Sequence, residues 1–323
     1  MANEFDLIAR YFERQAVNRK DVPLAIGDDC ALLEVPEGSQ LAVSTDSLVA
    51  GTHFLAEADP AWVAHKALAS NLSDLAAMGA TPAWVSLALT MPEPDEAWLA
   101  GFCEGFFALA EYYNVQLVGG DTTKGPLSIT LTVHGFVPHG QALTRSGANS
   151  GDWIYVTGNL GDSAAGLALL LGQKKVGSTE LEATLLERHH KAEPRILAGQ
   201  ALRGVASAAL DISDGLISDL GHILKRSGVA AEIDVDKLPL SPELEAFEPV
   251  RDKALQLALA SGEEYELCFT VPEQNRGTVE TALAHSGVKA TCVGQLRPGQ
   301  GITLVRNSQP LNWQLHGYDH FAE

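Results

Sequence analysis

Aspartates recur along the first half of this chain, mostly where a short apolar run ends. Asp28 and Asp29 follow one such run, Asp46 a second and Asp121 a third, while Asp74 lies in an Ala- and Leu-rich stretch. Carboxylate oxygens are the ligands that Mg²⁺ prefers, and the ion also binds substrate phosphates. Packed together without a cation, these carboxylates would repel one another. The pattern indicates a magnesium site for a phosphorylated substrate.

Each aspartate also has a simpler interpretation, because this residue is common in turns and at helix N-termini. Taken singly, the two interpretations are equally good, whereas the recurrence favours the metal site. Asp211-Ile212-Ser213-Asp214-Gly215 brings two more carboxylates and a hydroxyl to the expected start of a helix. That segment is either an N-cap or a second metal site.

Familiar nucleotide motifs are absent from the sequence: it contains no P-loop, no G-x-G-x-x-G after a strand and no protein-kinase signature. Gly119-Gly120, just before Asp121, would let backbone N–H groups approach a phosphate, but the pair also suits an ordinary turn. The turn at Gly158–Ser163 could hold an anion at a helix N-terminus or simply cap that helix. Phosphate neutralisation is therefore expected to depend on metal.

Several other residues are candidates for ligand contacts. Arg145 could pair with a polyphosphate or form a surface ion pair, and His53 is a candidate substrate contact. Tyr318, near the C-terminal end, could cover a ligand or close a core. His189 and His190 are expected on the solvated face of a helix, with no assigned role.

Short strands alternate with helices in both halves, which predicts an α/β fold built from α+β layers. The stretch from Arg145 to Asp152 is the expected boundary between domains 1–144 and 145–323. The main expected helices cover 4–15, 60–78, 95–113, 164–171, 181–190, 194–206, 216–227 and 274–285. The main expected strands cover 24–26, 41–46, 84–90, 116–118, 128–137, 153–157, 231–235, 265–271 and 291–294.

The net charge of −19 comes from 41 acidic and 22 basic residues, and it disfavours nucleic acid and anionic membranes as partners. The four cysteines lie far apart, as expected of reduced thiols rather than a structural zinc site. The first residues are acidic rather than signal-peptide-like. Together these features predict a cytoplasmic location.

Many segments, in the same order along the chain, resemble the thiamine-monophosphate kinase family, within the superfamily of aminoimidazole ribonucleotide synthetase. The resemblance extends from near residue 27 to the C-terminal end. The matching segments are Gly27-Asp28-Asp29, Ser44-Thr45-Asp46, Asn71-Leu72-Ser73-Asp74-Leu75-Ala76-Ala77-Met78-Gly79, Gly119-Gly120-Asp121-Thr122, Leu143-Thr144-Arg145-Ser146-Gly147-Ala148, Asp211-Ile212-Ser213-Asp214-Gly215, Gly262-Glu263-Glu264-Tyr265-Glu266-Leu267 and Gly317-Tyr318-Asp319-His320-Phe321.

The resemblance implies a two-domain aminoimidazole ribonucleotide synthetase-like fold, with an N-terminal domain that forms a dimeric β-barrel and a C-terminal α/β domain that closes the cleft holding ATP and several Mg²⁺ ions. The implied metal ligands are Asp29, Ser44, Thr45, Asp46, Asp74, Asp121, Asp211 and Asp214. The implied nucleotide contacts are Gly120, Asp121, Arg145 and Ser213. The implied contacts to thiamine monophosphate are His53, Glu263 and Tyr318.

The implied reaction is direct in-line transfer of the γ-phosphate of ATP to thiamine monophosphate, which yields thiamine diphosphate in its biosynthesis. The acceptor phosphate is already anionic, so no side-chain base is expected and no catalytic residue is assigned. The alternatives are selenophosphate synthetase, aminoimidazole ribonucleotide synthetase, a metal-dependent phosphohydrolase and a nucleotide-binding scaffold. The family's usual Gly-Glu-Asp reads Gly-Glu-Glu here, which leaves Glu264 open, and Trp313 competes with Tyr318 as the aromatic contact.

Overall fold

The computed structural model describes residues 4–13 and 15–318, which divide into two units. The first unit contains the described residues up to Leu75 together with Ala80–Gly140. The second unit contains Ala76–Gly79 and the described chain from Gln141 onward. The boundary between residues 144 and 145 stays a prediction, since this division by contacts begins the second unit slightly earlier.

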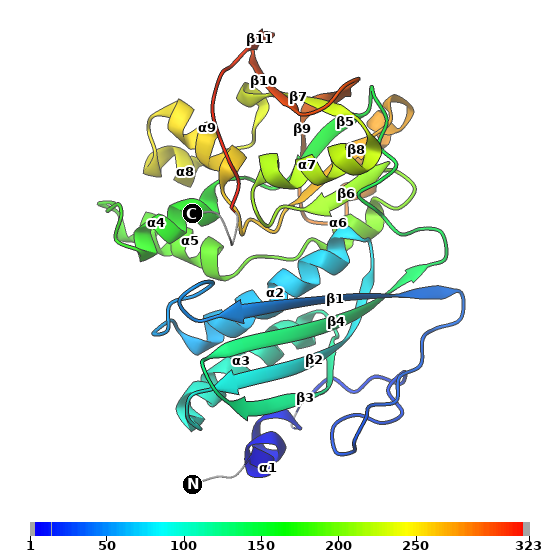
Figure 1. Cartoon of the computed structure of the whole chain (residues 1–323), viewed down its shortest axis with the longest axis vertical. Coiled ribbons are helices and arrows are strands. Elements are labelled where there is room, and N and C mark those ends of the chain that lie inside the picture. The colour runs from blue at the N-terminus through cyan, green and yellow to red at the C-terminus, as the bar shows by residue number, and fades with distance from the viewer. Residues whose placement is uncertain (1–3, 14, 319–323) are drawn as a thin grey trace. The chain divides into compact units, whose positions relative to one another are not determined.

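The first unit is built on an open four-stranded sheet with strand order β1-β4-β2-β3. Figure 1 shows helices α2 (Pro60–Ala77) and α3 (Glu96–Tyr112) along one face of this sheet. Alternate side chains of the strands, such as Ile129, Leu131 and Val133, are buried on that side. The strands are β1 (Ser39–Val49), β2 (Thr81–Met91), β3 (Gln116–Lys124) and β4 (Ser128–Pro138).

The opposite face of this sheet, called here the outer face, carries polar and apolar side chains in alternation with the buried ones. On β1 it includes Leu41 and Val43, whose residues are 43% and 55% exposed. The described strands close no barrel, so a dimeric barrel would require a second copy. The other outer-face residues of β1 and β4 are Thr45, Ser47, Val49, Thr130, Thr132 and His134.

Helices α2 and α3 confirm the two long helices predicted from the sequence. Asp95 caps α3, because its carboxylate accepts hydrogen bonds from the backbone N–H groups of Ala97 and Trp98. The two helices approach closely at Gly105, where a Cβ atom would lie 2.1 Å from the carbonyl oxygen of Ala61. Only glycine permits this contact between the helix backbones.

The expectation that Asp46 and Asp121 follow strand ends is wrong. Both aspartates lie inside strands, because β1 and β3 continue their pairing through the polar residues that the sequence suggested as turns. Polar side chains do not end a strand when the neighbouring backbone still supplies hydrogen bonds. Conversely, the expected strand at 24–26 forms only isolated bridges, such as that between Leu24 and Leu32.

The N-terminal helix is also shorter than expected. It comprises α1 (Glu4–Leu7) and the π-helical segment η1 (Ile8–Phe12), in place of one helix over 4–15. Phe12 is buried at 5% exposure, which anchors the segment. Tyr11 also contacts α3, since its hydroxyl donates to a carboxylate oxygen of Glu96 over 3.1 Å.

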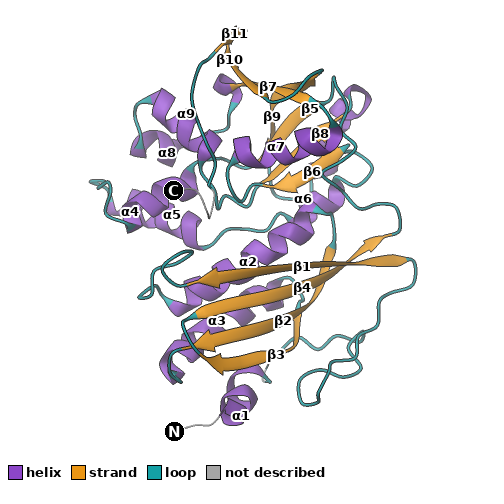
Figure 2. Cartoon of the chain, in the orientation of Figure 1, coloured by secondary structure: helices purple, strands orange, loops and turns teal. Residues whose placement is uncertain are grey.

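The second unit contains a mixed seven-stranded sheet with order β11-β10-β7-β9-β5-β8-β6, drawn in orange in Figure 2. Strands β7 and β10 are parallel and the other neighbours antiparallel, so both units contain α/β layers as predicted. The strands are β5 (Trp153–Thr157), β6 (Ala208–Asp211), β7 (Ala230–Asp234), β8 (Leu267–Val271), β9 (Ala290–Arg297), β10 (Ile302–Arg306) and β11 (Gln309–Pro310).

Seven α-helices are described in the second unit. Helix α7 places Leu216, Leu220, Ile223 and Leu224 in the main core, with the spacing of an amphipathic helix. Ala165 of α4 and Leu185 of α5 belong to a smaller core with α8 and α9. The helices are α4 (Asp162–Leu170), α5 (Thr179–His190), α6 (Ile196–Ala201), α7 (Leu216–Ser227), α8 (Pro242–Phe247), α9 (Arg251–Ala260) and α10 (Val279–Leu283).

Several expectations for these helices need correction. His189 and His190 are not solvated, since they are only 2% and 4% exposed at the end of α5. The expected helix over 194–206 shortens to α6, and that over 274–285 becomes a 3₁₀ segment, Glu273–Thr278, followed by α10. None of the helices described here combines the length and apolarity needed to cross a membrane.

Candidate active site

Four polar residues meet where the edge strand β1 packs against α2. Ser44 and Asp46 alternate with Thr45 along β1 and therefore point toward the helix. The Ser44 hydroxyl donates a hydrogen bond to Asp74, and the backbone N–H of Asp46 donates to Asn71 Oδ1 over 3.2 Å. Asn71 and Asp74 share a face of α2 because they lie three residues apart. Strand and helix together thus cluster the two carboxylates.

Burial and the charge of Asp74 both disfavour the ionised form of Asp46. Burial, followed by the negative charge of Asp74, raises the pKa of Asp46 to about 6. A divalent cation would relieve this repulsion, and the hydroxyl and carboxylate oxygens are the hard ligands that Mg²⁺ accepts. In the described chain, no three His, Cys, Asp or Glu side chains converge as a complete metal site. The donor set therefore fits Mg²⁺ with remaining positions filled by water or phosphate.

Thr45 does not join this cluster through its side chain. Strand alternation directs it to the outer face, where its hydroxyl lies 2.9 Å from that of Thr132. A metal role for Thr45 stays a prediction.

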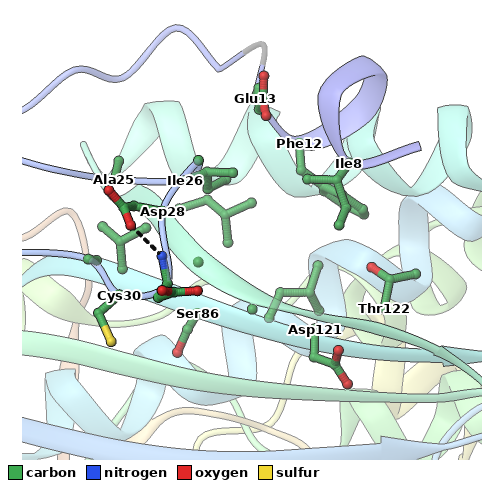
Figure 3. Close-up of a pocket in the computed structure, with 18 of the residues that line it drawn as sticks. Ile8, Phe12, Glu13, Ala25, Ile26, Asp28, Cys30, Ser86, Asp121 and Thr122 are labelled. Atoms are coloured by element: carbon green, nitrogen blue, oxygen red, sulfur yellow. Dashed lines mark hydrogen bonds between the residues drawn. The ribbon is translucent and has the colours of Figure 1, made fainter. Parts of the chain in front are cut away.

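A pocket of about 870 Å³ lies over β2 and β3 of the first unit, beside Ser86 and His134. Figure 3 shows the side chains of Ile8 and Phe12 entering it from the N-terminal helical segment, with Asp28 and Cys30 on the loop opposite. It has an apolar end, which suits a base, and a group of acidic and glycine residues, which suits phosphate accompanied by a cation. The acidic and glycine residues in its lining are Glu13, Gly27, Asp28, Asp29, Gly119, Gly120 and Asp121.

The local backbone accounts for the glycine at position 120 and for the turn at Asp28 and Asp29. A Cβ atom at Gly120 would lie 1.8 Å from the carbonyl oxygen of Leu87, so no larger residue fits there. The backbone N–H of Asp29 donates to Asp28 Oδ1 over 2.8 Å, drawn as the dashed line in Figure 3. This bond is local, within an exposed turn. Both features keep the backbone close to the pocket.

The structure does not bring Asp46 and Asp121 together within one copy. Strands β1 and β3 form opposite edges of the sheet, and the cross-strand row from Asp46 to Gly120 passes through Leu131 and Leu87. Three steps between strands at about 4.8 Å each separate the ends of this row by roughly 14 Å. Within a single copy, Asp46 and Asp121 therefore lie too far apart to contact the same ion directly.

The turn after β6 is organised by a residue that the sequence analysis did not single out. Asp219, only 4% exposed, accepts hydrogen bonds from the backbone N–H groups of Ser213 and Asp214 over 3.0 and 2.9 Å. Burial raises the pKa of Asp219 to about 7. The residue before α7 is Gly215, which has no side-chain cap. Ser213 and Asp214 are thus not the N-cap of α7.

Two backbone carbonyls of this turn hold two predicted substrate contacts. The backbone N–H of Glu263 donates to Ser213 over 2.7 Å, and that of Tyr318 donates to Asp214 over 3.0 Å. Gly262 allows the first contact, since a Cβ atom there would lie 2.3 Å from the carbonyl oxygen of Ser213. The structure therefore brings Ser213, Asp214, Glu263 and Tyr318 together within the second unit.

Both halves of the chain match one protein family. Residues 27–137 match AIR synthase related protein, N-terminal domain, and residues 149–307 match AIR synthase related protein, C-terminal domain. Thiamine-monophosphate kinase of Escherichia coli (strain K12) is 59% identical over 321 residues, covering 99% of this chain and 98% of the relative. The chain belongs to the thiamine-monophosphate kinase family.

Solved structures of the thiamine-monophosphate kinase family share this fold. The crystal structure of the enzyme from Stenotrophomonas maltophilia K279a superposes with a TM-score of 0.86 at 42% identity, covering 95% of this chain and 98% of that chain. The structure of AaThiL complexed with AMPPCP and TMP has a TM-score of 0.78 at 33% identity, covering 98% and 97%. These matches support the two-domain aminoimidazole ribonucleotide synthetase-like fold that the sequence suggested.

Three glutamates in the segment Gly262–Leu267 have different surroundings. Glu264 accepts hydrogen bonds from the backbone N–H of Gly161 over 2.8 Å and from the Ser261 hydroxyl over 3.1 Å. Glu266 is 6% exposed and accepts two hydrogen bonds from the Arg195 guanidinium, over 2.6 and 2.8 Å. Glu263 has a side chain that is 27% exposed. Of the three, Glu263 is therefore the one in a position to meet a ligand.

The side chain of Glu264 contacts a distant segment of the second unit. Its carboxylate faces the start of α4 at Gly161, and burial raises its pKa to about 8. No pattern in the single sequence pointed to this contact, because Gly161 and Glu264 are far apart along the chain.

The remaining predicted ligand contacts differ in their surroundings. The ring Nδ1 of His53 accepts a hydrogen bond from the backbone N–H of Val49 over 3.0 Å, which stabilises the turn after β1. Arg145 is exposed. Trp313 packs against the main core of the second unit and lies under the Arg306 guanidinium, whereas Tyr318 is 52% exposed. This difference favours Tyr318 over Trp313 as the aromatic ligand contact.

Proposed function

We propose that this chain phosphorylates thiamine monophosphate with ATP to give thiamine diphosphate and ADP. The observation that carries the proposal is identity of 59% to a thiamine-monophosphate kinase over nearly the whole chain. The acidic pair Asp46 and Asp74 supports it, because such a pair suits a cation that accompanies phosphates. No observation favours a phosphohydrolase or a scaffold.

The proposed nucleotide contacts are Gly120 and Asp121 in the first unit and Arg145 and Ser213 in the second. The pocket beside Gly120 supports the first two, since its apolar end suits a base and its glycine backbone suits phosphate. Mg²⁺, when bound, would neutralise the phosphate charge and align the reacting oxygens. The proposed ligands are Asp29, Ser44, Thr45, Asp46, Asp74, Asp121, Asp211 and Asp214, directly or through water.

The proposed acceptor contacts are His53, Glu263 and Tyr318. The carboxylate of Glu263 would complement the cationic thiazolium ring, and Tyr318 would offer an aromatic surface. An oxygen of the acceptor phosphate forms a bond to the γ-phosphorus of ATP, and the bond from that phosphorus to the bridging oxygen breaks to release ADP. Because the attacking oxygen is anionic, these residues need only bind and orient the acceptor.

We further propose that the chain acts in the cytoplasm as a homodimer, with the outer face of the first unit contributing to a shared β-barrel. Leu41 and Val43 support this, since a partner would cover their exposed apolar side chains. The separation of Asp46 from Asp121 across the sheet gives a second reason, because a partner could supply the missing group to each site. Domains 1–144 and 145–323 remain the proposed division.

The decisive experiment combines the purified chain with ATP, Mg²⁺ and thiamine monophosphate and quantifies thiamine diphosphate and ADP. Equal amounts of both products are expected, and omission of the acceptor or the metal should abolish them. Release of ADP and phosphate without thiamine diphosphate would overturn the proposal in favour of a hydrolase. ATP binding without turnover would favour the scaffold.

Substitution of Asp46 or Asp121 by Asn tests the metal assignment. Each change removes one negative charge while keeping the shape, so turnover should fall by at least a hundredfold, about 2.7 kcal/mol. Asp252→Asn, at an exposed ion pair with Arg306, is the matched control and should retain activity. Near-normal turnover in both site variants, with unchanged melting temperatures, would refute the assignment.

A further inference from the structure

A serine, a histidine and a glutamate lie close together beside the proposed acceptor site. Ser163 lies in the first turn of α4, His189 near the end of α5, and Glu263 in the turn before β8. Nδ1 of His189 is 3.0 Å from the Ser163 hydroxyl oxygen and 3.8 Å from Glu263 Oε2. Ser163 and His189 are each only 2% exposed, so this contact lies at the edge of the interior.

The arrangement is not a nucleophilic triad. In a triad, the histidine contacts the serine through one ring nitrogen and the carboxylate through the other. Here the same nitrogen faces both groups, and Ser163 is too buried to attack a substrate. What the geometry provides is a fixed imidazole beside a carboxylate that is partly exposed.

The backbone at Glu263 has an unusual conformation. Glu263 and Tyr265 have φ angles of 60° and 53°, a left-handed conformation that non-glycine residues rarely adopt. Backbone hydrogen bonds to Ser213 and Ile212 hold the turn, and buried contacts hold Glu264 and Glu266. These bonds fix the backbone of the turn, and the imidazole of His189 faces the Glu263 side chain.

We propose that His189, held by Ser163, is a positioning residue that orients the Glu263 carboxylate toward the cationic ring of the acceptor. The inference rests on the proposed function, in which Glu263 contacts thiamine monophosphate. The 3.8 Å separation exceeds a hydrogen-bond length, so the imidazole and the carboxylate face each other without a direct hydrogen bond in this conformation. An oriented carboxylate binds a cation more tightly, because less side-chain freedom is lost on binding.

The test measures steady-state kinetics of three variants. His189→Leu keeps the bulk but removes the polar nitrogen, so KM for thiamine monophosphate should rise about tenfold, equivalent to about 1.4 kcal/mol. KM for ATP should stay constant, and kcat should change by less than about threefold. His189→Asn keeps a polar atom near the Nδ1 position and should restore part of the affinity. Glu187→Gln, on the exposed side of α5, is the matched control and should behave as wild type.

A double-mutant cycle separates positioning from general stability. Glu263→Gln alone should also raise KM for thiamine monophosphate, and adding His189→Leu to it should cause little further change. If His189 merely stabilised the fold, the two effects would multiply, KM for ATP would rise as well, and His189→Asn would not rescue. Any of these three results would overturn the inference.

The wild-type control separates this inference from the proposed function. If the wild-type chain makes no thiamine diphosphate, the proposed function fails and the inference falls with it. If the wild type is active but the two substitutions multiply, only the role of His189 fails. Melting temperatures of all variants, measured alongside, show whether a folding defect contributes.

Discussion

At the scale of single residues, the second unit places carboxylates where water is scarce and relies on neighbouring groups to stabilise them. Glu266 has a full ion pair with Arg195, whereas the donors to Glu264 among the described residues are neutral, Gly161 and Ser261. An ionised carboxylate is costly in such surroundings unless a cation accompanies it. The different partners explain why burial raises the pKa of Glu264 to about 8.

Glu264 should therefore make folding depend on pH. Its pKa rises from an ordinary value of 4.5 to about 8 in the folded protein, so the folded state retains a proton that the unfolded state loses. The free energy of unfolding should fall as pH rises from about 4.5 to about 8. Glu264→Gln keeps the oxygen acceptor but cannot ionise, so its denaturant-unfolding profile should vary less over that range.

Glu245→Gln is the control for this measurement, since Glu245 is exposed and forms only a surface ion pair with Arg251. It should follow the wild-type pH profile. A Glu264→Gln profile parallel to that of wild type would mean that Glu264 ionises normally in the folded protein.

At the scale of elements, helices α2 and α3 and the central parts of strands β2 and β4 followed directly from the sequence, whereas the extents of β1 and β3 did not. Periodic apolar residues and the capping Asp95 define α2 and α3 locally. The polar segment around Asp46 is instead held in β1 by its register with β4, which is a non-local interaction. Short-range pattern therefore misplaced Asp46 and Asp121 at strand ends.

The packing of α2 on α3 gives a prediction for this scale. Gly105→Ala would place a methyl group 2.1 Å from the Ala61 carbonyl oxygen, so the helices would have to separate. We expect a loss of at least about 1–3 kcal/mol in the free energy of unfolding, measured with denaturant.

Gly101→Ala is the matched control in the same helix. Its added Cβ would lie 3.3 Å from the Cβ of Pro60, the side chain of a helix-terminal residue rather than helix backbone. It should cost much less than Gly105→Ala, because alanine favours the helix and the contact needs only a small shift. Equal losses for the two variants would contradict the close approach described for Gly105.

At the scale of the whole molecule, the sequence predicted the α/β class and many of the residues that the second unit brings together. The turn that holds Glu263 and Tyr318 connects segments already singled out from their residue types. His189, Asp219 and the partner of Glu264 were missed, because their roles depend on contacts between distant segments. Buried polar residues carry no periodic signal of their own, so only the assembled fold reveals them.

The outer face of the first unit gives a prediction about assembly. Val43→Asp places a charge among side chains that the proposed partner would bury, so the chain should become monomeric in size-exclusion chromatography with light scattering. Val250→Asp changes a residue of similar exposure, 52% against 55%, in the second unit and should leave the mass unchanged. A monomeric wild type, or a dimer unaffected by Val43→Asp, would refute the proposed interface.

The placement of Asp46 and Asp121 on opposite edges of one sheet has a consequence for mixtures of defective chains. If a symmetric dimer builds each site from Asp46 of one copy and Asp121 of the other, a hybrid of the two Asn variants retains one intact site. Random mixing after joint refolding would then restore about a quarter of the wild-type activity from two inactive parents. Two defective alleles would complement each other within a cell.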